Sequence, residues 1–266
     1  MRKFLYVLLA CFVLSSCSEY QKTLKAQDVG AKFKLGEELY NQGSFSKANR
    51  LFSQIVPSYR GKPQAEKLMY MYAKSYYEMK EYKISGYQFE RFVDSYPKSE
   101  KLEEAAFLGA KSYYFESPVY SKDQEDTRTA IEKLQLFINR FPKSEYLSEA
   151  SGYIQELDAK LERKAYEIAK QYNTISDYQA AIKSFDNFLF EFPGSSLRED
   201  AMYYKLDASY KLAMNSVERK KQQRLEAADE NYQVLKNSFA ETQYSEQIDK
   251  LHAEIVEELK KYSTKS

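Results

Sequence analysis

The 266-residue sequence contains only one histidine, two cysteines and no tryptophan. Because His252 is the only imidazole, neither a histidine-rich metal centre nor a histidine-based triad is expected. The sequence also lacks a P-loop and a G-x-G-x-x-G motif, so nothing indicates a nucleotide site. Adjacent acidic pairs such as Glu103-Glu104 diverge by about 100° on a helix and do not converge as a catalytic acid and base would. We therefore predict no catalytic residue, no metal ligand and no cofactor.

Glycine and proline are also scarce, at 8 and 6 residues. This scarcity, with abundant helix-forming residues, predicts an all-α chain without a sheet. The charge shows no excess of either sign, with 40 Lys and Arg against 39 Asp and Glu. Electrostatic binding of nucleic acid is therefore not expected. The 25 tyrosines and 16 phenylalanines are expected mainly to fill the seams between helices.

The first 17 residues follow the pattern of a bacterial lipoprotein signal. Arg2 and Lys3 precede an apolar run over residues 4–14, which is too short to span a bilayer. The sequence LSSC that ends at Cys17 resembles a lipobox, in which the chain is cut before the cysteine and the thiol receives diacylglycerol. We predict that residues 1–16 are removed and that Cys17 carries the lipid. The alternative is that Cys17 is an ordinary residue beside a secretory cleavage site.

The predicted mature chain begins with Cys17 and a polar tether over residues 17–29. Its one cysteine is consumed by lipid, so no internal disulfide is expected. Removing residues 1–16 leaves 38 basic and 39 acidic side chains, so acyl chains rather than a basic patch would supply the membrane affinity. Ser18, in place of Asp after the cysteine, resembles lipoproteins that are sent to the outer membrane.

A two-helix pattern recurs five times along the chain. In each copy a small residue is followed by large ones at i+4 and i+7, which share one helical face. The copies are Ala48-Phe52-Ile55, Ser85-Phe89-Phe92, Ala130-Leu134-Phe137, Ala181-Phe185-Phe188 and Ala228-Tyr232-Leu235. They are 37, 45, 51 and 47 residues apart, and an alanine stands eight residues after each of Pro57, Pro97, Pro142 and Pro193. This period predicts a solenoid of helix-turn-helix repeats.

The positions of residues that end helices predict the domain organisation. Residues 30–145 hold repeats one to three, and residues 146–266 hold a long bridging helix between Ser144 and Tyr172, repeats four and five, and a closing helix over Tyr244 to Tyr262. Residues 116–129 contain a proline and are predicted as an inserted loop. Ser99 is expected to cap the helix that follows the Tyr96-Pro97 stop. The ERKKQQR run at 218–224 is predicted to be a solvated helical face.

The repeats resemble a known family. Leu35-Gly36, Gly43, Ala48 and Phe52 stand at the spacings of the tetratricopeptide repeat (TPR). Together with the lipobox and the stops YPKS, FPKS and FPGS, they make the chain similar to the BamD family of outer-membrane-assembly lipoproteins. The resemblance implies a right-handed, non-enzymatic TPR solenoid of five repeats with a C-terminal capping helix, anchored by lipid at the periplasmic face of the outer membrane. It also implies three kinds of partner: the periplasmic domain of a BamA-like barrel protein, other assembly lipoproteins, and unfolded outer-membrane proteins.

One set of side chains is a candidate binding site. The first helices of repeats one to three each carry an aromatic pair at i, i+7, and successive pairs are 37 residues apart: Phe33 with Tyr40, Tyr70 with Tyr77, and Phe107 with Tyr114. Lys74 and Lys111 take one further position between two of these pairs. By resemblance to TPR proteins, these positions face the groove that holds extended peptides. Packing between helices and peptide binding both remain open interpretations of this aromatic ladder.

Two other functions remain as alternatives. One is a TPR lipoprotein that coordinates a different envelope or peptidoglycan complex. The other, less favoured, is a periplasmic hydrolase with a carboxylate pair across the groove.

Overall fold

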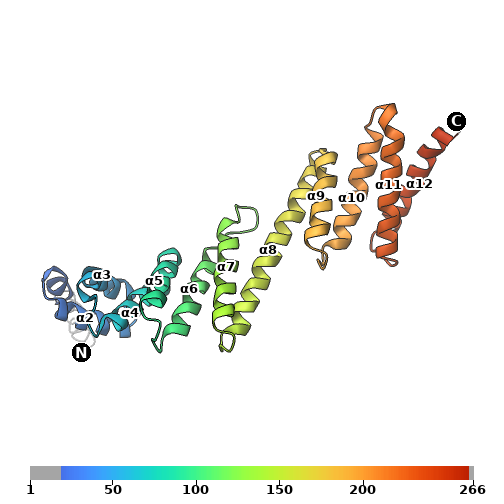
Figure 1. Ribbon diagram of the computed structural model, residues 1–266. Coiled ribbons are helices and arrows are strands. Elements are labelled where there is room, and N and C mark those ends of the chain that lie inside the picture. The colour runs from blue at the N-terminus through green and yellow to red at the C-terminus, as the bar shows by residue number, and fades with distance from the viewer. Residues whose placement is uncertain (1–18, 264–266) are drawn as a thin grey trace, which may run out of the picture. The chain divides into compact units, whose positions relative to one another are not determined.

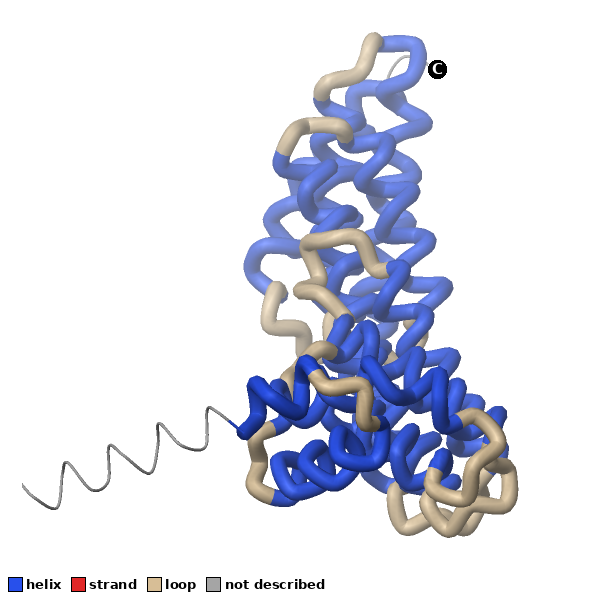
Figure 2. The backbone as a smooth tube through the Cα atoms, turned by 90° about the vertical axis from the view of Figure 1, so that its left-hand side faces the viewer, coloured by secondary structure: helices blue, strands red, loops and turns tan. Residues whose placement is uncertain are grey.

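The computed structural model describes residues 19–263. Within this range the chain forms helices joined by loops and no strand (Figures 1 and 2). The elements are α2 (Val29–Asn41), α3 (Phe45–Ile55), the 3₁₀ helix η1 (Val56–Tyr59), α4 (Ala65–Glu78), α5 (Tyr82–Ser95), α6 (Leu102–Glu116), α7 (Glu125–Arg140), α8 (Leu147–Thr174), α9 (Tyr178–Glu191), α10 (Arg198–Met214), α11 (Glu218–Ser238) and α12 (Ser245–Ser263). Residues 19–25, in the segment predicted as a tether, are also helical. The all-α prediction is confirmed, while the predicted signal peptide and Cys17 lie outside the described residues.

The helices follow the predicted repeat order. Five pairs, α2/α3, α4/α5, α6/α7, α8/α9 and α10/α11, are followed by the closing helix α12. The chain divides into two compact units after Leu157, inside α8. The long helix predicted between Ser144 and Tyr172 is confirmed, and the division predicted at residues 145 and 146 falls just before its first turn.

The predicted register of the repeats places the core correctly. The small residue of each copy is completely buried at 0% exposure: Ala48, Ser85, Ala130, Ala181 and Ala228. The large residues at i+4 and i+7 are buried as well, and they form the centre of each hydrophobic cluster. A small side chain lets the neighbouring helix approach closely, and the two large side chains then fill the seam. The repeat signal in the sequence is therefore the core of the protein.

The turns between repeats are held by a hydroxyl group that sequence reasoning placed wrongly. Helix α6 begins at Leu102, so Ser99 is not its N-cap. The Ser99 hydroxyl instead accepts a hydrogen bond from the Lys101 amide at 3.0 Å and donates one to Glu66 in α4 at 2.6 Å. Residues 100 and 101 therefore form a turn between the serine and α6, and the Ser99 hydroxyl accepts a hydrogen bond from an amide of this turn rather than from an amide inside the helix.

The same tie recurs at each later turn. In each case a hydroxyl donates to a glutamate on the first helix of the same repeat: Ser144 to Glu103 at 2.6 Å, Ser195 to Glu162 at 2.5 Å, and Thr242 to Glu199 at 2.5 Å. The last tie forms although Ala240 stands where the other turns have proline. The serine or threonine, rather than the proline, is therefore the element common to all four turns.

The turns within repeats one, two and four each contain a left-handed residue. Gly43, Lys80 and Ser176 have φ angles of 75°, 63° and 65° at equivalent places after α2, α4 and α8. This conformation costs a residue with a side chain about 1–2 kcal/mol, whereas glycine adopts it freely. Only the first repeat uses glycine there.

Replacing Lys80 or Ser176 with glycine is expected to raise the free energy of unfolding by about 0.5–1 kcal/mol, because relief of strain exceeds the added chain entropy. Gly43→Ala is expected to lower it by about 1 kcal/mol. Urea unfolding of the full chain measures each change, with Lys83→Gly, inside α5, as a control that should lose about 1 kcal/mol. Destabilisation by both new glycines would mean that these side chains contribute more than their strain.

The ERKKQQR run at 218–224 lies in the first two turns of α11, so its helical conformation is as predicted. Lys221 was predicted to be solvated, and this is wrong. Its Nζ lies 2.7 Å from a Glu258 carboxylate oxygen of α12, and only 18% of its side chain is exposed. The closing helix packs on α11 and covers this position, whereas Lys220 stays exposed as predicted.

Candidate peptide-binding surface

The aromatic ladder lies on the first helices of three successive repeats in the first unit. Phe33 and Tyr40 are in α2, Tyr70 and Tyr77 in α4, and Phe107 and Tyr114 in α6. Helices α2 and α4 are in contact, as are α4 and α6, so the structure places the three pairs on neighbouring helices. The two phenylalanines differ from the tyrosines in burial.

Phe33 and Phe107 are buried and fill helix seams. Phe33 is 7% exposed and stacks on Tyr59 with ring centroids 5.4 Å apart. Phe107 is 3% exposed and stacks on Tyr146 at 4.5 Å. The four tyrosines of the ladder are half-buried and keep part of their surface exposed. Of the aromatic ladder, the tyrosines are therefore the rings that a peptide can reach.

Glu104 of α6 gathers three donors from the ladder region. The Tyr70 hydroxyl donates to it at 2.5 Å, Lys101 at 2.9 Å and Lys74 at 3.3 Å. Burial alone would raise the pKa of Glu104, but these donors hold it below its usual value. The pKa of Tyr70 is raised, first by burial and then by its bond to Glu104. The network therefore stabilises the fold at neutral pH and weakens as the pH falls through the lowered pKa of Glu104.

A second network joins α6 to the start of α8. Lys111 lies 2.6 Å from a Glu149 carboxylate oxygen, and Tyr153 donates to the same oxygen at 2.5 Å. The Tyr114 hydroxyl donates to Glu156 at 2.5 Å, and this bond, followed by burial, raises the pKa of Tyr114 to about 12. The rings of Tyr114 and Tyr153 lie 4.1 Å apart. Both lysines of the candidate site thus already have a carboxylate partner on the first helix of the next repeat.

Sequence reasoning missed the acidic partners, although a signal for some of them was present. Glu149, Tyr153 and Glu156 follow the i, i+4, i+7 spacing that defines the rows Tyr70-Lys74-Tyr77 and Phe107-Lys111-Tyr114. The third row exchanges rings for acids and lysine for a ring, so a search for repeated residue types passed over it. Spacing alone would have found it.

His252 lies outside this surface, between the last two helices. Its Nε2 is 3.0 Å from Asp229 Oδ1, and its ring stacks on Tyr232 at 3.9 Å. Across residues 19–263, no group of three or more His, Cys, Asp or Glu side chains is placed to hold a metal ion.

Comparison with known families decides the relationship. The family model described as "YfiO: Outer membrane lipoprotein" matches residues 25–225, which is most of the chain. The chain belongs to this family of outer membrane lipoproteins. The resemblance to the BamD family is therefore confirmed. The match to the YfiO family includes α2 to α10 complete, and so the whole aromatic ladder.

Other comparisons add less to the YfiO assignment. The TPR2AB-domain:pHSP90 complex of yeast Sti1 is a solved structure that shares 15% identity, with 86% of this chain and 98% of that chain covered. The TM-score is 0.38, so we draw no argument from it. No curated protein matches. Among the helices of residues 19–263, none is both long and apolar enough to cross a membrane.

Proposed function

We propose that this lipoprotein is a non-enzymatic scaffold of the outer-membrane β-barrel assembly (BAM) complex. In this role it binds a BamA-like barrel subunit through that subunit's periplasmic domain, together with other assembly lipoproteins. The observation that carries the proposal is the family match over residues 25–225. A helical-repeat chain suits the role, because stacked helix pairs present extended surfaces to protein partners.

The anchor belongs to the same proposal. Lipid on Cys17 would hold the chain at the periplasmic face of the outer membrane, and the following residues would set the distance to the first repeat. A near-neutral mature chain offers no electrostatic substitute for the acyl chains.

We further propose that the aromatic ladder engages unfolded outer-membrane proteins. The exposed parts of Tyr40, Tyr70, Tyr77 and Tyr114 offer apolar faces with polar rims to alternate side chains of an extended peptide. Phe33 and Phe107 support the site by packing beneath it. Lys74 and Lys111 already pair with Glu104 and Glu149. Each could bind the terminal carboxylate of a peptide only by giving up that glutamate partner. The rings are therefore expected to supply most of the affinity.

The substitutions Tyr70→Ala and Tyr77→Ala are each expected to weaken binding of a barrel protein's C-terminal peptide by about 1–2 kcal/mol. Lys74→Ala should matter most at low salt, where its charge is least screened. Fluorescence anisotropy with a labelled peptide and the full chain measures both effects. Tyr87→Ala is the matched control, because Tyr87 is 55% exposed on α5 and outside the ladder. If both ladder variants remain folded and bind like the parent chain, these rings only pack.

The assembly role is tested separately by affinity purification of the full chain from its own membranes. Recovery of a BamA-like barrel protein is expected. Recovery of a peptidoglycan or other envelope complex without that barrel would favour the alternative scaffold role.

A further inference from the structure

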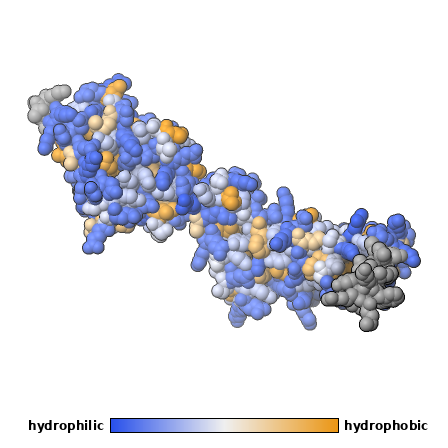
Figure 3. Space-filling view, turned by 180° about the vertical axis from the view of Figure 1, so that it is seen from behind, coloured by the Kyte–Doolittle hydropathy of each residue, from blue (hydrophilic) through white to orange (hydrophobic). Residues whose placement is uncertain are grey.

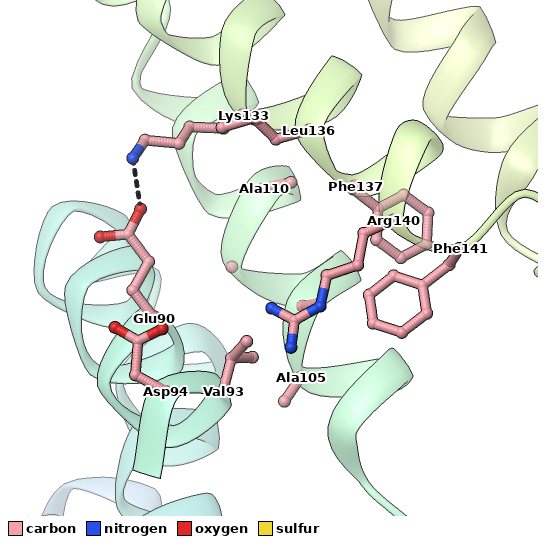
Figure 4. A pocket seen from close by; sticks show the side chains of 12 residues that line it. Glu90, Val93, Asp94, Ala105, Ala110, Lys133, Leu136, Phe137, Arg140 and Phe141 are labelled. Carbon is pink, nitrogen blue, oxygen red and sulfur yellow. Dashed lines mark ion pairs between the residues drawn. The ribbon is translucent and has the colours of Figure 1, made fainter. Parts of the chain in front are cut away.

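A second surface lies on the other side of α6. Figure 3 shows one face of the molecule, which is mainly hydrophilic with scattered apolar side chains. A hollow of about 320 Å³ opens between α5, α6 and α7 (Figure 4), and we call it the α5–α7 hollow. It reaches the lower end of the size range of ligand sites.

The floor of the hollow is apolar and made of small residues. It consists of Ala105, Ala106, Gly109 and Ala110 of α6, with Val93 and Phe137 beside them. Gly109 packs closely on α5, because an added Cβ there would lie 3.1 Å from the Cβ of Phe89 and would require a shift of a few tenths of an ångström. Leu136, 54% exposed, adds an aliphatic side chain to the lining. This lining suits an aliphatic side chain supplied by another molecule.

The walls carry four charged side chains, and two of them are paired with each other. Glu90 of α5 and Lys133 of α7 form an ion pair at 2.8 Å (Figure 4). Within residues 19–263, Asp94 of α5 and Arg140 of α7 have no ionic or hydrogen-bond partner, although both line the hollow. The Arg140 guanidinium carbon lies 5.4 Å from the centre of the Phe141 ring, and the group points into the hollow. Stacking on a ring orients a guanidinium for a carboxylate.

In the hollow at the corresponding place in the second unit, the charged side chains already have partners. It holds about 260 Å³ between α9, α10 and α11. Its Lys205 pairs with Asp186 at 2.7 Å, and its Arg198 donates to the Leu189 carbonyl at 3.2 Å. A hollow at this place is thus common to both units. Of the two hollows, only the α5–α7 hollow has an acidic and a basic side chain without a partner in the described part of the chain.

We propose that the α5–α7 hollow binds an extended segment of a partner protein, in which an aliphatic side chain lies between an acidic and a basic residue. The acidic residue pairs with Arg140, the basic residue with Asp94, and the aliphatic side chain rests on the α6 floor. A peptide suits the hollow better than an enclosed small molecule, because Asp94, Leu136 and Arg140 are all exposed at its opening. Gly109 is two residues from both Phe107 and Lys111, about 160° around α6, so this site is separate from the aromatic ladder.

The probe is an immobilised array of pentapeptides. Side chains at alternate positions of an extended chain share one face, so the array contains Lys-X-Φ-X-Glu and its reverse order, with Φ as Val, Leu, Ile or Met. The array also includes counterparts in which uncharged residues replace the Lys and the Glu. The full chain is expected to bind charged members more tightly than uncharged ones. Failure of every charged member to do so would overturn the proposal.

The best member is then titrated against variants of the full chain. Arg140→Glu is expected to lower its affinity at least about tenfold, and exchanging the peptide's Glu for Lys should restore binding to that variant. Ala106→Leu, which fills the floor, should cause a similar loss. Arg128→Glu, an exposed arginine of α7 outside the hollow, should stay within about twofold.

Two results would overturn the site. Equal losses for Arg128→Glu and Arg140→Glu would show non-specific attraction. A loss for Tyr77→Ala as large as that for Arg140→Glu would place the peptide on the aromatic ladder instead. Thermal melts confirm that each variant is folded.

Discussion

Phe89→Ala is expected to lower the free energy of unfolding by about 3–5 kcal/mol. The ring is completely buried in the first unit, with the Tyr70 ring 6.2 Å away between centroids. Gly109 lies against its Cβ, so no flexible side chain there can move in to fill the cavity. The full cost of lost transfer and residual cavity is therefore expected.

Phe185→Ala should cost a similar amount, because Phe185 holds the equivalent place in the second unit and is also 0% exposed. Thermal and urea unfolding of the full chain compares both variants with Lys220→Ala, which should change stability by at most about 0.5 kcal/mol. If the two units unfold in separate transitions, each substitution should shift a different one. Equal losses in all three variants would contradict the repeat register.

Cys17→Ser is expected to move the protein from the membrane to the soluble fraction while leaving the repeats folded. A buried acyl chain contributes roughly 0.8 kcal/mol per CH₂ group, and the 38 basic and 39 acidic side chains of the predicted mature chain cannot replace that affinity. Fractionation and labelling with radioactive palmitate measure the result.

Cys11→Ser is the matched control for the anchor, since Cys11 lies inside the predicted signal peptide and should be discarded with it. This variant should incorporate palmitate like the parent chain. Palmitate that persists after Cys17→Ser would show that the lipid is attached elsewhere.

The fold was readable from the sequence because its core repeats locally. A small residue followed by large ones at i+4 and i+7 encodes both the helix face and the seam that it fills, and Ala48 and Phe52 already show the pattern. Long-range partners leave no such local trace. The hydroxyl of Ser99 looked like a helix cap because nothing in the sequence reveals that it donates a hydrogen bond to Glu66 of α4.

The binding surfaces were predictable only in part. The ladder tyrosines were found from their register, but burial of Phe33 and Phe107 depends on Tyr59 and Tyr146, which follow no shared spacing with them. The α5–α7 hollow left no sequence signal at all. Asp94 and Arg140 are 46 residues apart on different helices, and only packing brings them to one opening.

The hydroxyl ties at the turns also bear on how fast the chain folds. They join residues that are 33, 41, 33 and 43 positions apart, so each closes within about one repeat length. Relative contact order is the mean sequence separation of contacting residues divided by chain length. An added repeat lengthens the chain but brings contacts of the same short separation, so the relative contact order falls. Folding can then nucleate in any repeat and propagate to its neighbours. A variant carrying one additional complete repeat is therefore expected to fold at nearly the same rate as the natural chain.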